Sequence, residues 1–392
     1  MTQTDWKTGF RVEEFTSLES SSSLQPQWNA LAERAPNVTV FSTWEWQTTW
    51  WKHYGAGNVL RLIAVHKGER LVGLLPLYTK RTALAAFLGM REAQLVGAGG
   101  DTSPDYLGPL IEPDCEQAVA DILAERVVDT RSEWDVLNFT DMSPGPFLEL
   151  LVKRLNATGL DVKVSTSNTI KVARLPGTWD EYLATMHRDR RYRVRNLRRN
   201  ALQKLGAQFR LPQTDTQLWA AVDDLIALHH KRWASKDDTK GAFRSTPYVG
   251  FHREAIERCH RQGWVRLYCM EAAGKAAAVF YCYRYRDEVL YFQSGFDPEL
   301  EKFSLGQVLM GFAIESAIAE GAKVFDLLKG DHPYKNSWSN DVRATFDLLA
   351  HNTSVLGRLG RLRGKLAAFM KTRNTLTPSS GPPAVAIRSP RT

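Results

Sequence analysis

RLIAVHKGERLVGLLPLY (residues 61–78) and RLYCMEAAGKAAAVFYCY (residues 266–283) are the two stretches that decide the fold. Each reads as two apolar, β-prone runs joined by a turn that contains glycine, a pattern that predicts a β-hairpin. The stretches have equal length, begin with Arg-Leu and end with Tyr. The chain therefore repeats one predicted hairpin at two distant places.

The segments that follow the two hairpins also correspond. The first hairpin is followed by a strand pattern, a loop, a helical pattern and a buried strand pattern: REAQLVG (91–97), CEQAVADILAERVVD (115–129) and WDVLNF (134–139). The second is followed by the same order: VLYFQSG (289–295), a helix over about 307–320 and KVFDLL (323–328). This matched order predicts two copies of one mixed α/β unit.

The length of 392 residues also favours two domains, because it exceeds what one ordinary core holds. We place an N-terminal domain at residues 1–160 and a C-terminal domain at residues 161–352. The second begins with two predicted strands in residues 160–177, followed by a helical region that is rich in arginine over residues 179–205. Residues 353–392 are expected to form a basic helix and a disordered tail rich in Pro and Ser.

The composition is that of a soluble globular protein, with 43% hydrophobic and 24% charged residues. There is no apolar run of the length that spans a membrane and no pattern typical of a secretory signal. The four cysteines have neither metal nor disulfide spacing, and no His or Cys cluster predicts a metal site. We expect a cytoplasmic protein without a metal, and the sequence leaves peripheral attachment to the inner membrane open.

The net charge of +8 favours an anionic partner, and two segments concentrate it. HRDRRYRVRNLRRN has seven arginines between Arg188 and Arg199, and its apolar residues fit one helical face that Arg190 interrupts. Residues 356–373 have six basic residues, no acidic ones and leucines at helical intervals. Nucleic acid (tRNA), an anionic membrane surface and a phosphorylated substrate remain open as partners, as does a solvated face.

The segment FSLGQVLMGFAIESAIAEG (residues 303–321) predicts a helix whose first turn can bind an anion. Ser304 and Gln307 have the spacing of a capping box, and Gly321 is a plausible stop. Free backbone N–H groups at such a start attract phosphate, and Gly306 would let a ligand approach closely. The candidate cofactor-binding residues are Phe303, Ser304, Leu305, Gly306 and Gln307. The alternative is a well-capped helix without a ligand.

FDLLKGDHPYKNSW (residues 325–338) is a buried strand that runs into a loop mixing charged, aromatic and turn residues. Ligands of α/β proteins lie beyond the carboxyl ends of strands. His332 could act as a base, and Asp331 could orient His332 or itself deprotonate the substrate. Tyr334 could return a proton to a leaving group, and Lys335 could stabilise negative charge. The alternative is a solvated turn. The first copy, NFTDMSPGP (residues 138–146), lacks the His, Tyr and Lys. This difference favours a functional role for residues 325–338 over a solvated turn.

The aromatic segment FSTWEWQTTWWKHYG (residues 41–55) has rings at helical spacing and predicts core packing; lining of a substrate site is the minority interpretation. No Walker A, dinucleotide-binding or nucleophile-elbow motif is found in the chain.

Taken together, the motifs resemble the CelD-like, FemAB-related branch of the GNAT acyltransferase superfamily (BioF2-like acetyltransferase domains). The resemblance spans about residues 41–338 and rests on FSTWEWQTTWW, LLPLY, PDYLGPLI, LHHKRW, YFQSGFDPE, SLGQVLM and EGAKVFDLLKGDHPYKNSW. It implies tandem GNAT-like domains, each a mixed β-sheet flanked by helices, with the catalytic site mainly in the second.

The resemblance also implies transfer of an acyl group, typically acetyl, from acyl-CoA to an amine or hydroxyl, in polysaccharide or cell-envelope biosynthesis. The CoA pyrophosphate would lie at the loop before the Ser304 helix, although the usual phosphate loop is reduced here. The motifs carry over a set of substrate-binding residues: Asp326, Gly330, Trp338, Asp105, Tyr106, Arg232 and Trp233. FemAB relatives use aminoacyl-tRNA instead, so that donor stays open, as does a non-catalytic module that binds an anionic polymer or membrane.

Overall fold

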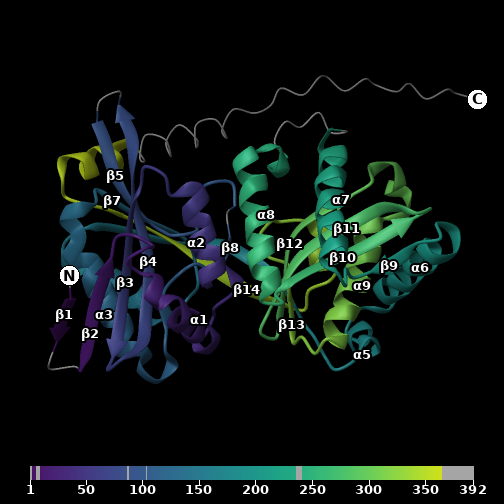
Figure 1. Cartoon of the computed structure of the whole chain (residues 1–392), viewed down its shortest axis with the longest axis horizontal. Helices are drawn as coiled ribbons and strands as arrows, with labels where there is room; N and C mark the ends of the chain where they lie inside the picture. The colour runs from purple at the N-terminus through teal and green to yellow at the C-terminus, as the bar shows by residue number, and fades with distance from the viewer. Residues whose placement is uncertain (1, 6–8, 86–87, 103, 235–240, 364–392) are drawn as a thin grey trace, which may run out of the picture.

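The computed structural model describes residues 2–5, 9–85, 88–102, 104–234 and 241–363. In this part of the chain the strands form one continuous mixed sheet that runs through two halves lying side by side (Figure 1). The strand order is β1-β2-β3-β4-β5-β7-β14-β8-β13-β12-β11-β10-β9, with β6 beside β4. Helices cover both faces of the sheet in each half, so the α/β fold class is confirmed.

The N half consists of the elements up to residue 157: β1 (Thr2–Asp5), β2 (Phe10–Phe15), α1 (Gln25–Arg34), α2 (Trp44–Tyr54), β3 (Val59–Lys67), β4 (Arg70–Ala85), β5 (Leu88–Leu95), β6 (Leu110–Ile111), α3 (Glu116–Asp129), β7 (Val136–Met142) and α4 (Pro146–Ala157). The C half consists of α5 (Trp179–Ala184), α6 (Arg188–Lys204), β9 (Gln208–Arg210), α7 (Asp215–Ala234), α8 (Thr246–Arg261), β10 (Val265–Ala272), β11 (Lys275–Tyr285), β12 (Glu288–Phe296), α9 (Leu305–Ala319), β13 (Val324–Asp326) and α10 (Pro333–Asn336). The remaining strands, β8 (Asp161–Arg174) and β14 (Asp341–His351), link the halves.

The predicted repeat is confirmed by this element order. The hairpins β3–β4 and β10–β11 are each followed by a strand, a helix and a parallel strand. Both hairpins also contain a register shift at the same place. It lies four residues after Arg61 in the first hairpin and four residues after Arg266 in the second. A bulge at the same position supports a common origin for the two units.

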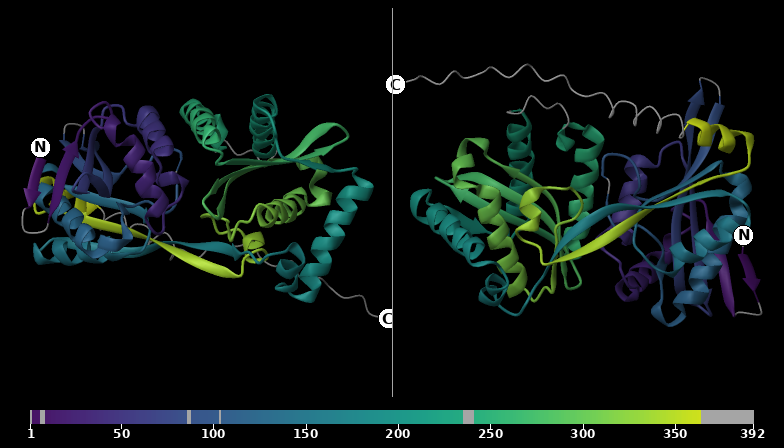
Figure 2. Two further views of the ribbon diagram at one scale, coloured as in Figure 1. Left: turned by 60° about the horizontal axis from the view of Figure 1, so that its bottom comes forward. Right: turned by 180° about the vertical axis from the view of Figure 1, so that it is seen from behind.

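The segment predicted as two strands is one long strand, β8, which pairs with β14 from Asp161 to Val172. The polar run STSN (residues 165–168) resembles a turn in the sequence, but it lies where this two-stranded ribbon crosses between the halves (Figure 2). The end of β14 pairs with β7 of the N half, whereas the end of β8 pairs with β13 of the C half. Each half therefore completes its sheet with both linking strands.

One hydrophobic core joins the two halves. Trp46 on α2 is fully buried and packs edge-on against Phe251 of α8 and Tyr283 of β11, with ring centroids 5.0 and 5.6 Å apart. Phe41 and Trp44 are buried in the same cluster, and Trp51 and Tyr54 pack against it half-buried, so the core prediction for residues 41–55 is confirmed. Separate clusters lie under α3 and α4 in the N half and under α6 and α9 in the C half.

Candidate active site

The sheet of the C half opens at the end of β13. Strands β12 and β13 pair only from Glu288 to Leu290, after which the backbone N–H of Leu327 donates to Lys171 of β8 instead. The rest of β12, through Phe296, has no strand beside it on that edge. A cavity of about 260 Å³ lies there, lined by Arg232, Phe280, Tyr291, Ser294, Phe296, Asp297, Glu301, Ser304, Leu305, Gly306, Gln307 and Tyr334. We call it the donor cleft.

The first turn of α9 forms one wall of the donor cleft, and its start differs from the prediction. Ser304 has a left-handed backbone (φ 53°) and makes no side-chain cap bond, so the predicted capping box is wrong. The Gln307 side chain instead accepts hydrogen bonds from Arg190 (2.6 Å) and Trp338 (3.0 Å). Among the described residues no side chain caps the first N–H groups, and the positive end of the helix dipole faces the cleft.

Four of the five candidate cofactor residues line this cleft: Ser304, Leu305, Gly306 and Gln307. Phe303 is partly buried and packs against the core of the C half. A Cβ at Gly306 would have no atom nearer than 3.9 Å, so there is room for a ligand. Arg232 joins these residues, with its guanidinium 4.1 Å from the centre of the Phe296 ring. Trp233 on the same helix points elsewhere and donates to His229 (3.0 Å).

The loop and short helix after β13 separate the four candidate catalytic residues. Asp331 and His332 are exposed, and the His332 ring stacks on Tyr334 with centroids 5.9 Å apart. Tyr334 lines the donor cleft, and burial raises the pKa of its hydroxyl. The backbone turns inward at Gly330, whose φ of 109° suits glycine.

Lys335 points the other way, into the protein. It is 3% exposed and its Nζ donates to the carbonyls of Leu328 (2.9 Å) and Lys329 (2.7 Å). Burial lowers the pKa of this ammonium to about 8, against the attraction of Asp105, Asp326 and Asp331. Two of the three N–H donors of the Lys335 ammonium therefore hold the loop in place.

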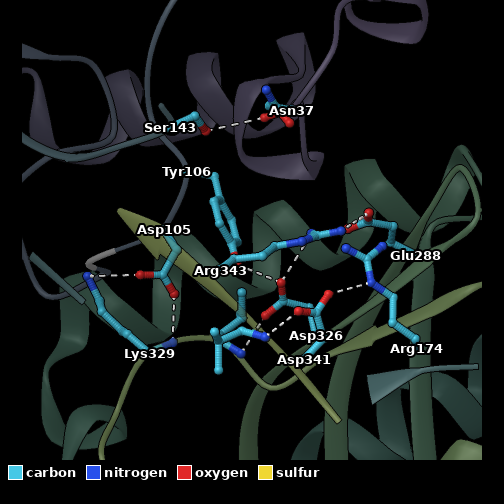
Figure 3. Close-up of polar contacts among 12 residues, drawn as sticks. Asn37, Asp105, Tyr106, Ser143, Arg174, Glu288, Asp326, Lys329, Asp341 and Arg343 are labelled. Atoms are coloured by element: carbon cyan, nitrogen blue, oxygen red, sulfur yellow. Dashed lines mark hydrogen bonds and ion pairs between the residues drawn. The ribbon is translucent and has the colours of Figure 1, made fainter. Parts of the chain in front are cut away.

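A buried polar cluster joins the halves at the end of β13 (Figure 3). Asp326 is fully buried and accepts hydrogen bonds from the Tyr106 hydroxyl (2.6 Å) and the Leu328 backbone (2.7 Å). Arg343 lies 3.4 Å from the same carboxylate and forms a bidentate pair with Glu288. Burial raises the pKa of Asp326 to about 6, which its hydrogen bonds and Arg343 oppose.

Asp105 enters this cluster from the N half. It is 1% exposed and accepts a hydrogen bond from the Lys329 backbone (2.8 Å), while the Lys329 ammonium donates to Asp141 (2.7 Å). Its Oδ1 lies 3.7 Å from that ammonium and receives no hydrogen bond from any described residue. Burial raises the pKa of Asp105 to about 7. Shifted pKa values of this kind concentrate at functional sites.

A groove of about 430 Å³ opens beside this cluster and is shared by both halves. It is lined by polar and charged residues, among them Asn37, Thr39, Tyr106, Ser143, Arg174, Arg286, Asp287, Glu288 and Arg343. We call it the junction groove. Sequence reasoning identified Tyr106 but missed Arg343, Glu288 and Arg286, which stand on ordinary strands and turns and are joined only by the fold.

The N half has an equivalent opening that its own chain fills. Strands β5 and β7 pair only at Glu92 and Ala93. This paired stretch is short, like that of β12 and β13 in the C half. Beyond that point Leu107 is inserted beside β7: its N–H donates to Asp141 (2.9 Å) and its carbonyl accepts from Ser143 (3.0 Å). Leu107 is 2% exposed. The loop that carries Asp105 and Tyr106 into the C half therefore also closes the cleft of the N half.

Comparison with known proteins agrees with this geometry. Residues 188–336 match the family model described as acetyltransferase (GNAT) domain. This segment is similar to GNAT acetyltransferase domains. It covers α6 to α10, and hence every residue that lines the donor cleft. No curated protein matches the chain.

Solved structures show the same fold at low identity. The crystal structure of FemX is 11% identical with a TM-score of 0.59, covering 86% of this chain and 96% of that one. A C-terminal domain from Agrobacterium fabrum, described as that of a lysylphosphatidylglycerol synthetase, is 11% identical with a TM-score of 0.53, covering 93% and 99%. A protein of unknown function from Bacteroides thetaiotaomicron is 8% identical with a TM-score of 0.54, covering 84% and 97%. Likeness at this level concerns the fold, not the substrate.

No group of three or more His, Cys, Asp or Glu that could hold a metal occurs among the described residues. None of the helices in the described ranges has the length and apolar character needed to cross a membrane.

Proposed function

We propose that the protein is an acyltransferase that binds acyl-CoA in the donor cleft and transfers the acyl group to an amine or hydroxyl. The observation that carries this proposal is the opening between β12 and β13, which leads to the uncapped start of α9. A phosphate-bearing carrier with an extended arm fits both parts of this site. Cleft and helix start lie within the GNAT-type domain.

The pyrophosphate of CoA would accept hydrogen bonds from the backbone N–H groups at Leu305 and Gly306. Arg232 on the opposite wall adds positive charge. The amide-containing arm of CoA would lie along the free edge of β12 and pair with it as an added strand. This arrangement brings the thioester to the end of β13, near Tyr334.

In the transfer step the acceptor's nitrogen or oxygen attacks the thioester carbonyl, and His332, oriented by Asp331, removes its proton. The resulting oxyanion collapses, the carbon–sulfur bond breaks, and Tyr334 gives a proton to the leaving thiolate. Lys335 holds positive charge beneath the site and fixes the loop through its two carbonyl contacts. The products are the acylated acceptor and free CoA, so the step needs no further reactant.

The acceptor would enter from the junction groove, because this groove reaches Tyr106 and Arg343 at the buried end of β13. Its charged lining suits a polar precursor of a polysaccharide or of the cell envelope. We infer a substrate contact for Tyr106, which lines the junction groove. The buried Asp105, Asp326 and Trp338 would act by positioning, since Asp326 accepts from Tyr106 and Trp338 donates to Gln307. Gly330 would shape the loop that joins these residues to the cleft.

The test is steady-state release of free thiol from acetyl-CoA with a panel of amine and hydroxyl acceptors. Tyr334→Phe and His332→Ala should each lower kcat about 100-fold, the usual effect of losing a general acid or base. The matched controls are Tyr192→Phe and His187→Ala, two exposed residues outside the cleft, which should leave kcat unchanged. If His332→Ala and Lys335→Ala both retain full turnover, these assignments are wrong. A wild-type protein that neither binds nor turns over acyl-CoA would favour a non-catalytic binding module.

A second candidate donor is aminoacyl-tRNA, and the observation that favours it is helix α6. Arg188, Arg195 and Arg199 are exposed and recur along one face of this helix. On the opposite face, Arg190 connects α6 to Gln307 at the donor cleft, so a polyanion on α6 would end near the cleft. The double variant Arg195→Glu/Arg199→Glu distinguishes the donors. It should leave acetyl-CoA turnover unchanged but abolish transfer from aminoacyl-tRNA, and Lys275→Glu serves as the control for charge reversal elsewhere.

A further inference from the structure

Residues 355–363 form a helix after β14 that is docked on the N half. Figures 1 and 2 show this helix beside the hairpin of β4 and β5. Ser354 anchors its start: the hydroxyl accepts from the Gly357 N–H (3.1 Å) and donates to Asp135 (2.8 Å). Arg361 pairs with Asp161 on β8 (2.7 Å). The helix is therefore held by specific contacts.

Two buried glycines face the protein on this helix, beside the half-buried Leu356. A Cβ at Gly357 would meet the carbonyl of Asn352 and lie 2.8 Å from that of Asp135. A Cβ at Gly360 would lie 2.8 Å from the Met90 sulfur of β5. The glycines that weaken this helix in isolation thus let it approach the sheet closely. Val355, Leu359 and Leu362 are left for the outer face.

The outer face is apolar and exposed. Val355, Leu359 and Leu362 are 75%, 40% and 57% exposed, and their spacing places them on one side of the helix. Within the described part of the chain only eight large apolar side chains are strongly exposed, and three of them lie in these nine residues. Such a concentration is typical of an interaction surface.

The charges around this face indicate what covers it. Arg358, Arg361 and Arg363 are exposed beside the apolar residues, and the sequence from Leu356 to Arg373 has six basic residues and no acidic one. A second copy of the same face would bring these cations together and repel. An apolar row bordered by arginines matches a bilayer interface with anionic headgroups. The sequence TALAAFLGM, between Arg81 and Arg91 at the end of β4 and the start of β5, has the same composition of apolar residues bordered by cations.

We propose that residues 355–363 dock the protein on an anionic membrane surface, with Val355, Leu359 and Leu362 at the boundary between headgroups and acyl chains. Arg358 contacts the phosphates above this boundary, while Arg361 keeps its pair with Asp161. The glycine face keeps the helix attached to the N half, so the catalytic half is held at a fixed distance from the bilayer. This inference does not depend on the identity of the acyl donor.

The experiment is flotation of the full-length protein with vesicles of phosphatidylcholine alone or mixed with phosphatidylglycerol. The wild type should float with the anionic vesicles only, and raised salt should weaken binding. Leu359→Glu/Leu362→Glu should lower the partition coefficient at least about tenfold, because each leucine contributes about that factor. Leu202→Glu on α6, 45% exposed, is the matched control and should float as the wild type. Since the replaced side chains are exposed, thermal melting should not change.

Three outcomes would overturn the proposal. The first is a wild type that does not float with anionic vesicles, or floats equally with neutral ones. The second is unchanged flotation of the double leucine variant. The third is a dimer in sedimentation that the double variant converts to a monomer, because the apolar face would then be covered by a second copy.

Discussion

Asp105 is a carboxyl group that the N half delivers to the end of β13, where burial raises its pKa to about 7. The PDYLGPLI motif marked this residue, but only the fold shows that it meets Lys329 of the other half.

At the same scale, Ser304 and Gln307 show the limit of local patterns. Their spacing predicts a capping box, yet Gln307 binds Arg190 and Trp338, which are distant in sequence. The hydrogen bonds to these two distant residues outweighed the local preference of Gln307 for a capping box.

Asp105→Asn should change how stability depends on pH. The folded carboxyl binds a proton that the unfolded chain releases above about pH 4, so wild-type stability should fall as pH rises from about 4 to about 7. The loss relative to the Asn variant should be about 4 kcal/mol across this range. Urea denaturation of both proteins at several pH values measures it. Parallel pH curves for the two proteins would contradict the raised pKa.

At the scale of elements, two strand ends decide where a ligand can enter. Both β5–β7 and β12–β13 separate after a short paired stretch, but Leu107 fills the first opening and the start of α9 borders the second. The hairpins, helices and repeat order were predictable because periodicity and turn residues act locally. The inserted loop was not, since its residues 96–109 have no periodic pattern. The long strand β8 was missed for a related reason, because its polar middle resembles a turn.

Gly306→Glu should separate helix stability from donor binding. A carboxylate in the first turn favours the helix dipole but repels a phosphate at the same place. The KM for acyl-CoA should rise at least about tenfold, while the melting temperature stays equal or rises. Ala319→Glu, exposed at the other end of α9, is the control and should leave KM unchanged. Thermal shift and initial-rate measurements decide between these results, and an unaltered KM in Gly306→Glu would count against a phosphate at α9.

Leu107→Ala should lower the stability of the whole fold without affecting the donor cleft. Removing this buried side chain should lower the free energy of unfolding by about 3 kcal/mol, as for other core leucines. The KM for acyl-CoA should stay the same, because the donor cleft lies in the other half. Leu202→Ala, at an exposed position, should have almost no effect in the same denaturation experiment. A large rise in the KM for acyl-CoA in Leu107→Ala would mean that the N half takes part in donor binding.

At the scale of the whole molecule, the halves share two strands and one core. The sheet passes from one half to the other through β14 and β8, and Trp46 packs against residues of the C half. Composition and repeat order predicted two units but not this exchange, because strand pairing between distant segments has no local signal. The junction groove depends on the exchange, since Arg174 and Arg343 stand on the shared strands.

Trp46→Ala should therefore destabilise both halves together. Loss of a fully buried tryptophan should lower the free energy of unfolding by about 4 kcal/mol, and circular dichroism and tryptophan fluorescence should report one coincident transition. Trp46→Phe should cost less, because it keeps an aromatic ring and the indole N–H has no hydrogen-bond partner among the described residues. Two separate transitions would show that the halves unfold independently.

Isothermal titration of the wild-type chain with acetyl-CoA tests the central claim most directly. The C half has an open donor cleft, and in the N half Leu107 occupies the equivalent opening. The predicted result is one molecule of acetyl-CoA bound per chain. Two molecules per chain, or no binding at all, would contradict the assignment of a single acyl-CoA site to the C half.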